Sequence, residues 1–305
     1  MIVKYSLLQQ LMLESKAMAA ALGTTICGDR EFRWGERTYI MGILNVTPDS
    51  FSGDGLGSDV EAAVDRAKRM VEDGADILDV GGESTRPGSE PTGAAEEMER
   101  ILPVIESLAH HCPAVVSVDT YKAEVAQAAL EAGARIINDI TALRGDKRMA
   151  GLAATSGAGL ILMHMQGEPR SMQLEPAYQD VVTEVRDFLA AQATLAQQAG
   201  VEPTRIVLDP GIGFGKTLEH NLELIRGLPA LSGLGYPVML GASRKNFIGV
   251  LTGRQEPSQR LWGSVGVHVL GAALGADIVR VHDVAPLKEA LAVCDAVMAR
   301  EASHG

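Results

Sequence analysis

Apolar residues gather into short runs that recur regularly from residue 40 onward. Each run is short enough for a β-strand, and it is followed by a longer stretch whose apolar positions return at helical spacing. We expect strands at 40–45, 77–80, 114–119, 136–138, 159–164, 206–209, 237–241 and 278–281. We expect helices at 60–71, 94–109, 122–132, 178–199, 217–228, 258–274 and 287–300. Strands alternating with helices in this way are typical of a parallel sheet.

The number of these units favours a closed barrel. Eight strand–helix units in about 260 residues match a single-domain α/β protein with the (β/α)8 TIM barrel fold, here over residues 31–300. A doubly wound open sheet is the alternative. Residues 1–30 form an N-terminal extension, and residues 31–41 contain two apolar runs around a short polar turn, which predicts a β-hairpin. No low-complexity linker divides the chain.

Nearly every predicted strand ends in a polar residue. A single Asp after an apolar run is usually a helix cap or a turn residue. Helix capping does not explain why a polar residue follows nearly every one of the eight strands. Capping also does not require an Arg or a His. A barrel gathers its strand carboxyl ends on one face, where barrel active sites lie, so this face is the candidate site. The residues concerned are Asn45, Asp79, Asp119, Asn138, His164, Asp209, Ser243, Arg280 and His282.

Two loops on the same predicted face are rich in Gly, Ser and Pro. The first spans residues 47–55 after the first strand, and the second spans 81–89 after the next. Loops of this composition at a barrel's catalytic face are expected to cover the site. Ordinary connecting loops remain the alternative, although Phe51 is a large apolar side chain without an obvious core partner there.

Composition and charge narrow the possible partners. The 46% hydrophobic content suffices for a large core, and the formal net charge of -12 disfavours binding to nucleic acid or to a membrane surface. No stretch is long and apolar enough for a membrane span, and the first residues do not resemble a secretory signal. Cys27, Cys112 and Cys294 show no paired spacing and predict thiols in a reducing compartment, so we expect a cytoplasmic protein.

A set of motifs now gives the chain a family resemblance. MGILNVTPDSFSGDG, DVGGESTRPGSEP, SVDT, IINDI, LMHMQG, LDPGIGFGKT, GASRK and RVHDV occur in the order found in dihydropteroate synthases. Each motif alone is weak, whereas the ordered set is specific and covers roughly residues 31–300. The resemblance implies a transferase of folate biosynthesis. Such an enzyme condenses 6-hydroxymethyl-7,8-dihydropterin diphosphate with 4-aminobenzoate and releases 7,8-dihydropteroate and pyrophosphate.

The resemblance also implies a deep pterin site. A buried carboxylate such as Asp209 can accept hydrogen bonds from two pterin donors together, and an amide such as Asn138 serves mixed donor and acceptor positions. Lys245 can donate to the ring carbonyl. For Met163, simple core packing remains an equal alternative. By resemblance the pterin contacts are Asp119, Asn138, Met163, Asp209, Phe214 and Lys245.

Diphosphate binding and catalysis are assigned in the same way. Arg280 and His282 alternate along the last strand and so point to one side of it, and Asn45 resembles the family's Mg2+-associated residue. Mg2+ keeps several waters, so one amide oxygen with diphosphate oxygens is chemically reasonable. A cationic pterin intermediate is implied, which a carboxylate can stabilise. The catalytic residues implied are Asp119, Lys245, Arg280 and His282.

The second substrate is expected nearer the surface. By resemblance 4-aminobenzoate lies among Phe51, Thr85, Pro87, Ser243 and Lys245, while Asp54 and Arg86 act in loop closure. Ser243 precedes a predicted helix start, where backbone N–H groups favour a carboxylate. Sulfonamides imitate 4-aminobenzoate, but the sequence does not distinguish a sensitive enzyme from a resistant one. A homodimer is expected from the family alone.

Two rival functions remain. A pterin-binding barrel that transfers a methyl group to a corrinoid would share the pterin residues. It would not need the STRPG segment or the run Ser243-Arg244-Lys245. A non-catalytic paralogue that binds pterin or a partner protein would have lost loop or phosphate residues, and these are intact here.

Overall fold

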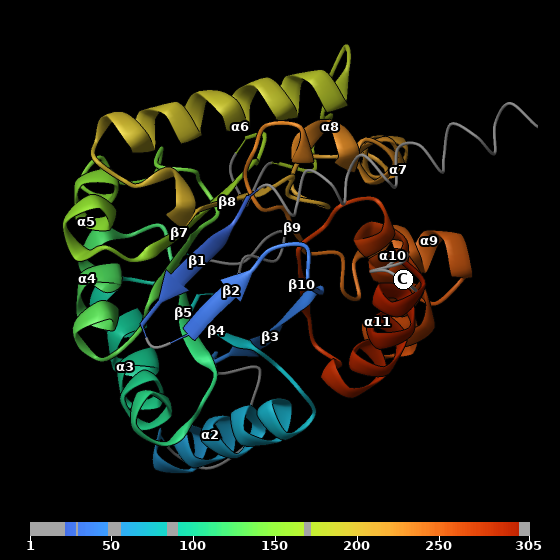
Figure 1. The fold of residues 1–305 in the computed structure, drawn as a ribbon. Coiled ribbons are helices and arrows are strands. Elements are labelled where there is room, and N and C mark those ends of the chain that lie inside the picture. Colours follow the sequence, from blue (N-terminus) through green and yellow to red (C-terminus); the bar gives the residue numbers. More distant parts are fainter. Residues whose placement is uncertain (1–21, 29, 48–55, 84–90, 168–171, 299–305) are drawn as a thin grey trace, which may run out of the picture.

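The computed structural model shows a parallel barrel surrounded by helices (Figure 1). It describes residues 22–28, 30–47, 56–83, 91–167 and 172–298. Eight strands pair in the order β8-β7-β6-β5-β4-β3-β10-β9, and a single parallel bridge between Leu208 and Val238 joins the two ends of this series. The barrel strands are β3 (Tyr39–Asn45), β4 (Ile77–Gly81), β5 (Val115–Asp119), β6 (Ile136–Asp139), β7 (Gly159–Met163), β8 (Ile206–Asp209), β9 (Met239–Leu240) and β10 (Ile278–Val281).

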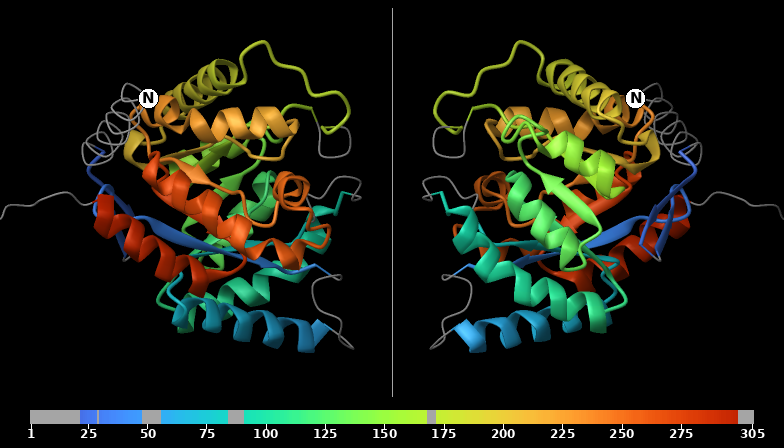
Figure 2. Two further views of the ribbon diagram at one scale, coloured as in Figure 1. Left: turned by 90° about the vertical axis from the view of Figure 1, so that its right-hand side faces the viewer. Right: turned by 90° about the vertical axis from the view of Figure 1, so that its left-hand side faces the viewer.

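The helices lie outside the barrel, in the connections between successive strands (Figure 2). They bury the outward-facing strand residues, such as Leu78, Val80, Val116 and Val118, in one continuous apolar cluster. The helices are α2 (Leu56–Glu72), α3 (Ala94–His111), α4 (Ala123–Glu131), α5 (Met149–Ser156), α6 (Val181–Gln198), α7 (Leu218–Arg226), α8 (Leu228–Ser232), α9 (Asn246–Thr252), α10 (Leu261–Ala273) and α11 (Val284–Met298), with short 3-10 turns η2 (Pro203–Arg205) and η3 (Pro257–Arg260).

Side-chain alternation along the strands divides the barrel interior into two layers. Successive strand residues point to opposite faces, so residues two apart share the interior. Near the amino ends the inward residues are apolar, as in Ile77, Ile136 and Ile278, and they pack in a second cluster. Two residues later the inward positions are polar on several strands, giving Asp79, Asn138 and Arg280. The sequence therefore builds an apolar floor beneath a polar mouth.

An antiparallel hairpin covers the amino end of the barrel. Its strands are β1 (Thr24–Cys27) and β2 (Arg30–Arg33), so the expected hairpin is confirmed but lies earlier than the predicted 31–41. Tyr39, which we had expected in the hairpin, instead begins the first barrel strand. The rings of Phe32 and Trp34 stack, and Tyr39 packs edge-on against both, within the same cluster as the barrel floor. The hairpin thus closes this end with aromatic packing.

The predicted TIM barrel is confirmed strand by strand, and two helices were missed. These are α5 and α8, which have eight and five residues. Helices so short show no clear helical period in the sequence. The seven-residue α9 begins where a helix start was expected after Ser243. Among the described residues, no helix is both long and apolar enough to cross a membrane.

Candidate functional site

A pocket opens at the carboxyl end of the barrel, among residues from five of its strands and from the loops after β6, β8 and β9. The apolar part of its wall belongs to a small cluster formed by Ile140, Met163, Met165, Met172 and Phe214. Its polar part comes from strand ends far apart in the sequence. The lining residues are Asp119, Asn138, Ile140, Met163, Asp209, Gly211, Phe214, Gly241, Lys245 and Arg280. All six residues expected to contact a pterin therefore surround one cavity.

Arg280 forms the centre of the polar wall. Its Nε donates to Asp79 Oδ2 at 2.6 Å, and its Nη2 donates to Asp119 Oδ2 at 2.6 Å. Burial opposes the charge on this guanidinium, but the two carboxylates outweigh it and raise the Arg280 pKa. Burial raises the pKa of Asp119, and the Arg280 guanidinium opposes that rise. The pocket wall thus holds an arginine that forms ion pairs with carboxylates on two neighbouring strands, β4 and β5.

The side-chain amide of Asn138 is held in one orientation, and its carbonyl oxygen is available to a ligand. Its Nδ2 donates to Asp79 Oδ2 at 2.9 Å, which sets the orientation of the amide. Asn138 Oδ1 is buried and has no hydrogen-bond partner among the described residues. A buried acceptor without a partner is costly, so its presence in a pocket indicates that a ligand donor completes it.

Asp209 is held by the turn that follows β8. Gly211 N donates to Asp209 Oδ1 at 2.7 Å. Gly211 has φ +66°, and a Cβ at this position would lie 1.9 Å from the carbonyl oxygen of His164, so only glycine fits. Burial raises the pKa of Asp209 to about 6, although the Gly211 hydrogen bond opposes the rise. The carboxylate is thus aimed into the pocket with Oδ2 not engaged by this turn.

Lys245 enters the pocket from the loop after β9, beside the loop that follows β8. It is the N-cap residue of α9, and its Nζ lies 4.0 Å from the centre of the Phe214 ring. Burial and the nearby Arg280 lower the pKa of Lys245 to about 8, while Asp209 and Asp119 oppose this change. The Lys245 ammonium therefore lies against the Phe214 ring and near the carboxylates of Asp209 and Asp119.

Ser243 and His282 form a second polar pair. Ser243 Oγ lies 2.9 Å from His282 Nδ1 and accepts from the His282 backbone N–H at 3.2 Å. Arg244, between Ser243 and Lys245, has a left-handed backbone with φ +58°. Ser264 and an ion pair with Asp283 hold it there. A non-glycine residue in this conformation is uncommon and clusters at functional sites.

Neither Ser243 nor His282 lines this pocket, although both lie beside residues that do. Burial lowers the pKa of His282 to about 3, and the cations Arg244 and Arg280 act in the same direction. The neutral imidazole can therefore donate or accept a hydrogen bond without adding charge. The positive charge of this part of the site therefore comes from Arg244, Arg280 and Lys245 and not from His282.

Asn45 ends β3 opposite Gly81 of β4 and is partly exposed. Among the described residues no group of three His, Cys, Asp or Glu side chains could enclose a metal ion. A lone amide oxygen suits Mg2+ that is held mainly by water and by substrate oxygens, which is how Mg2+ commonly binds phosphates. The donor set therefore fits the expected ion.

The structure corrects one expectation and adds one residue. His164 was grouped with the strand-end polar residues, but it follows Met163 and faces the outer side. There its Nδ1 lies 3.0 Å from Lys216 Nζ and its ring packs edge-on against Phe188. Asp79 was noted at a strand end without a role. It is fully buried and orients both Asn138 and Arg280, and only its inward register on β4 could have indicated this.

Five predicted site residues lie outside the described residues. They are Phe51, Asp54, Thr85, Arg86 and Pro87.

Comparison with known proteins agrees with this geometry. The family model described as pterin binding enzyme matches residues 41–282. The dihydropteroate synthase of Synechocystis sp. is 47% identical over 270 residues, covering 88% of this chain and 93% of that protein. The Xanthomonas albilineans dihydropteroate synthase structure with 4-aminobenzoic acid superposes with a TM-score of 0.85 at 46% identity, covering 91% of this chain and 99% of that chain. The Yersinia pestis dihydropteroate synthase structure in a sulfonamide drug complex has a TM-score of 0.85 at 40% identity, covering 90% of this chain and 98% of that chain.

Proposed function

Because the chain belongs to the dihydropteroate synthase family, we infer that it condenses 6-hydroxymethyl-7,8-dihydropterin diphosphate with 4-aminobenzoate. The products are 7,8-dihydropteroate and pyrophosphate, which makes the protein a transferase of folate biosynthesis. The cytoplasm is the proposed place of action. One observation carries the assignment: Asp119, Asn138, Asp209, Lys245 and Arg280 converge on one pocket from separate strands and loops.

The pocket's hydrogen-bonding groups complement a pterin. Asp209 and the free Asn138 Oδ1 are acceptors for the amino and ring N–H donors of the pterin edge. Lys245 is a donor for the ring carbonyl. Met163, Ile140 and Phe214 supply the apolar surface against the ring. A flat heterocycle that carries donors along one edge and a carbonyl acceptor satisfies all of these groups together.

The reaction is a displacement at the methylene carbon attached to the pterin. The carbon–oxygen bond breaks, and its electron pair leaves with pyrophosphate. The amine nitrogen of 4-aminobenzoate forms the new bond and loses a proton. Asp119 stabilises positive charge that develops on the pterin, because its carboxylate lies in the wall of the same pocket. Arg280 stabilises the departing diphosphate, and His282 donates a hydrogen bond to it.

Asn45 is the proposed protein ligand of Mg2+. The bound ion would supply charge neutralisation for diphosphate oxygens. This role needs no further protein carboxylate, in agreement with the donors found at the end of β3.

The function is tested by incubating the purified chain with the two substrates, with and without Mg2+. We expect dihydropteroate and pyrophosphate to form in equal amounts, and the rate to fall sharply when Mg2+ is chelated. Methyl transfer from methyltetrahydrofolate to a corrinoid, measured in parallel, should not occur. Pterin binding without condensation would contradict the assignment and favour a non-catalytic protein.

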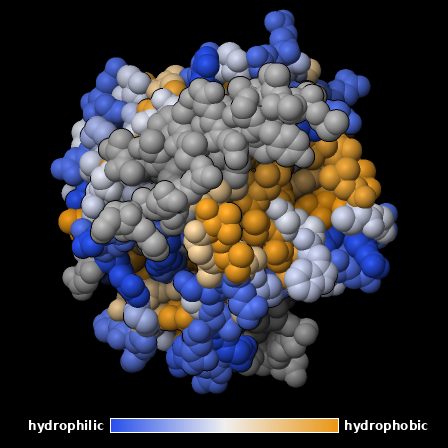
Figure 3. Space-filling model, turned by 45° about the vertical axis from the view of Figure 1, so that its right-hand side comes forward, coloured by the Kyte–Doolittle hydropathy of each residue, from blue (hydrophilic) through white to orange (hydrophobic). Residues whose placement is uncertain are grey.

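A homodimer is proposed on the face formed by α9, α10 and α11. This side of the molecule carries a hydrophobic patch (Figure 3). Large exposed apolar patches mark association surfaces. The exposed apolar residues of these helices are Val250, Leu251, Trp262, Leu270, Val293 and Val297.

We expect Trp262→Glu to convert the dimer to a monomer, because a carboxylate cannot be buried there without a partner. Light scattering during size-exclusion chromatography measures the mass. Leu174→Glu is the matched control, since Leu174 and Trp262 are both 77% exposed but only Trp262 lies on this face. A dimer that survives Trp262→Glu would rule out this surface.

Phe51 and Pro87 are proposed to control discrimination between 4-aminobenzoate and sulfonamides. A sulfonamide extends beyond the carboxylate position of the natural substrate, so small shape changes there penalise it selectively. We expect Phe51→Leu and Pro87→Ser to raise the sulfonamide inhibition constant on the order of tenfold relative to the 4-aminobenzoate KM. Proportional changes in that constant and in both substrate KM values would show that these residues only stiffen their loops.

A further inference from the structure

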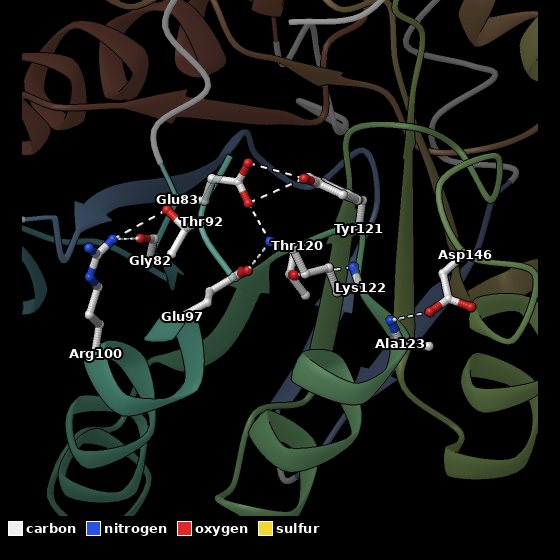
Figure 4. A network of polar contacts seen from close by, with 10 residues as sticks. All are labelled: Gly82, Glu83, Thr92, Glu97, Arg100, Thr120, Tyr121, Lys122, Ala123 and Asp146. Atoms are coloured by element: carbon white, nitrogen blue, oxygen red, sulfur yellow. Dashed lines mark hydrogen bonds and ion pairs between the residues drawn. The ribbon is translucent and has the colours of Figure 1, made fainter. Parts of the chain in front are cut away.

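Two lysines in loops at the carboxyl end of the barrel are largely buried, and they differ in how their charge is compensated. Lys122 forms ion pairs with Glu83 and Glu97 (Figure 4). Lys216, in the loop after β8, is 3% exposed and forms no ion pair with any of the described residues. Removing an ammonium from water is costly unless nearby groups compensate it, so the other contacts of Lys216 must hold it in place.

The Lys216 ammonium faces three neutral acceptors. Its Nζ donates to the carbonyl oxygen of Phe214 at 3.0 Å and to that of His164 at 3.4 Å. The third acceptor is His164 Nδ1 at 3.0 Å, in the tautomer whose proton is on Nε2. Burial lowers the pKa of Lys216 to about 7, and the nearby Asp209 carboxylate opposes this change. Lys216 thus joins the end of β7 to the turn after β8, from behind a pocket that it does not line.

The turn that Lys216 holds, residues 211–215, consists largely of glycine, and we call it the glycine turn. Gly211, Gly213 and Gly215 have left-handed backbones. Glycine restricts the chain least, so the turn depends on neighbouring side chains to keep its shape. The hydroxyl of Tyr178 donates to the carbonyl oxygen of Gly215 at 2.9 Å. Lys216 and Tyr178 therefore hold two successive carbonyl groups of this turn.

The expected pterin contacts depend on where the glycine turn lies. Gly211 N donates to Asp209 Oδ1 at 2.7 Å. Phe214 lines the pocket, and its ring centre lies 4.0 Å from Lys245 Nζ. A shift of the turn would therefore move a carboxylate acceptor and an aromatic wall together, and it would remove the surface on which the Lys245 ammonium rests.

We propose that Lys216 is a positioning residue for the pterin and that it acts through the glycine turn. The inference rests on the proposed function, in which Asp209 and Phe214 contact the pterin. Small displacements of contact groups lower binding and turnover strongly. Tyr178 supports the same turn with one neutral hydrogen bond, so its loss should act in the same direction and to a smaller extent.

The test compares purified full-length variants by calorimetric titration with 6-hydroxymethyl-7,8-dihydropterin diphosphate and by steady-state kinetics with both substrates. Lys216→Met keeps an unbranched side chain and removes the three donors. Tyr178→Phe removes only a hydroxyl and changes no charge, so a loss of affinity there reports on the turn itself. Thr25→Val is the control for lost stability, because it removes the buried acceptor of Trp34 Nε1 at the amino end of the barrel.

We expect Lys216→Met to weaken pterin diphosphate binding by about 10–100-fold and Tyr178→Phe by about 2–10-fold. The 4-aminobenzoate KM at saturating pterin diphosphate should change little. Thr25→Val should lower the unfolding midpoint and leave pterin affinity unchanged.

Unchanged pterin affinity in Lys216→Met, or proportional rises in both KM values, would overturn the proposal. If Lys216→Met does not fold, wild-type affinity in Tyr178→Phe would overturn it instead. A loss of pterin affinity in Thr25→Val as large as in Lys216→Met would show that general destabilisation is the cause. A wild-type chain that binds no pterin diphosphate would refute the proposed function itself, and the inference with it.

Discussion

Replacing Asp209 with Asn is expected to weaken pterin binding by roughly 5–150-fold, which corresponds to about 1–3 kcal/mol. The Gly211 N–H already occupies Asp209 Oδ1. The amide oxygen would keep that bond and leave an NH2 group facing the pterin donors. Two donors would then meet in a buried site, where an unpaired group is costly. Calorimetric titration with a pterin measures the effect directly.

The pH dependence gives an independent check on the same residue. Burial raises the pKa of Asp209 to about 6, so the carboxylate gains a proton and loses acceptor capacity as the pH falls through 6. Wild-type pterin affinity should therefore fall as the pH drops through 6, in addition to any change at higher pH from Asp119 and Lys245, whose pKa values are about 7 and about 8. The Asn variant has no proton to gain and should lack this fall. Unchanged affinity in a folded Asn variant would show that Asp209 does not bind the pterin.

The second large effect is on stability, and it concerns Arg280. Arg280→Met should lower the free energy of unfolding by about 3–5 kcal/mol, because it leaves the carboxylates of Asp79 and Asp119 buried without their cation. Urea unfolding followed by circular dichroism gives the value. Arg148→Met is the control, since Arg148 also forms an ion pair with an aspartate but its side chain is 68% exposed.

A double variant separates the lost pairing from lost packing. In Arg280→Met with Asp79→Asn, one of the two uncompensated charges is removed, so part of the lost stability should return. Asp79→Asn keeps an oxygen for Asn138 Nδ2. If the double variant is no more stable than Arg280→Met, the cost comes from packing around the arginine and not from the buried carboxylates.

The sequence predicted the barrel well because its strands are buried on both sides and are punctuated regularly. All eight predicted strands overlap the observed ones, including β9, which has two residues. The hairpin was misplaced because the apolar run that begins at Tyr39 looks alike whether it pairs within a hairpin or enters the barrel. Only the tertiary contact with β10 distinguishes these outcomes.

For the site, the residues on strand ends were predicted and their partners were not. Asp119, Asn138, Asp209 and Arg280 lie in the pocket as the motifs implied. Asp79 had the same signature but no assigned role, and His164 had it while facing the helices. A polar residue at the end of a strand is expected near the site. A shift of one position along the strand decides whether its side chain faces the barrel interior or the helices.

The hairpin of β1 and β2 across the amino end of the barrel affects how ligands enter and leave the site. Phe32, Trp34 and Tyr39 pack beneath the apolar floor of the barrel, so ligands reach the pocket from the carboxyl end of the strands. We therefore expect a ligand at the bottom of the pocket to bind before the ligand above it and to leave after it. The pterin half of the product is therefore the last part of it to leave, and a molecule lodged at the mouth traps what is below.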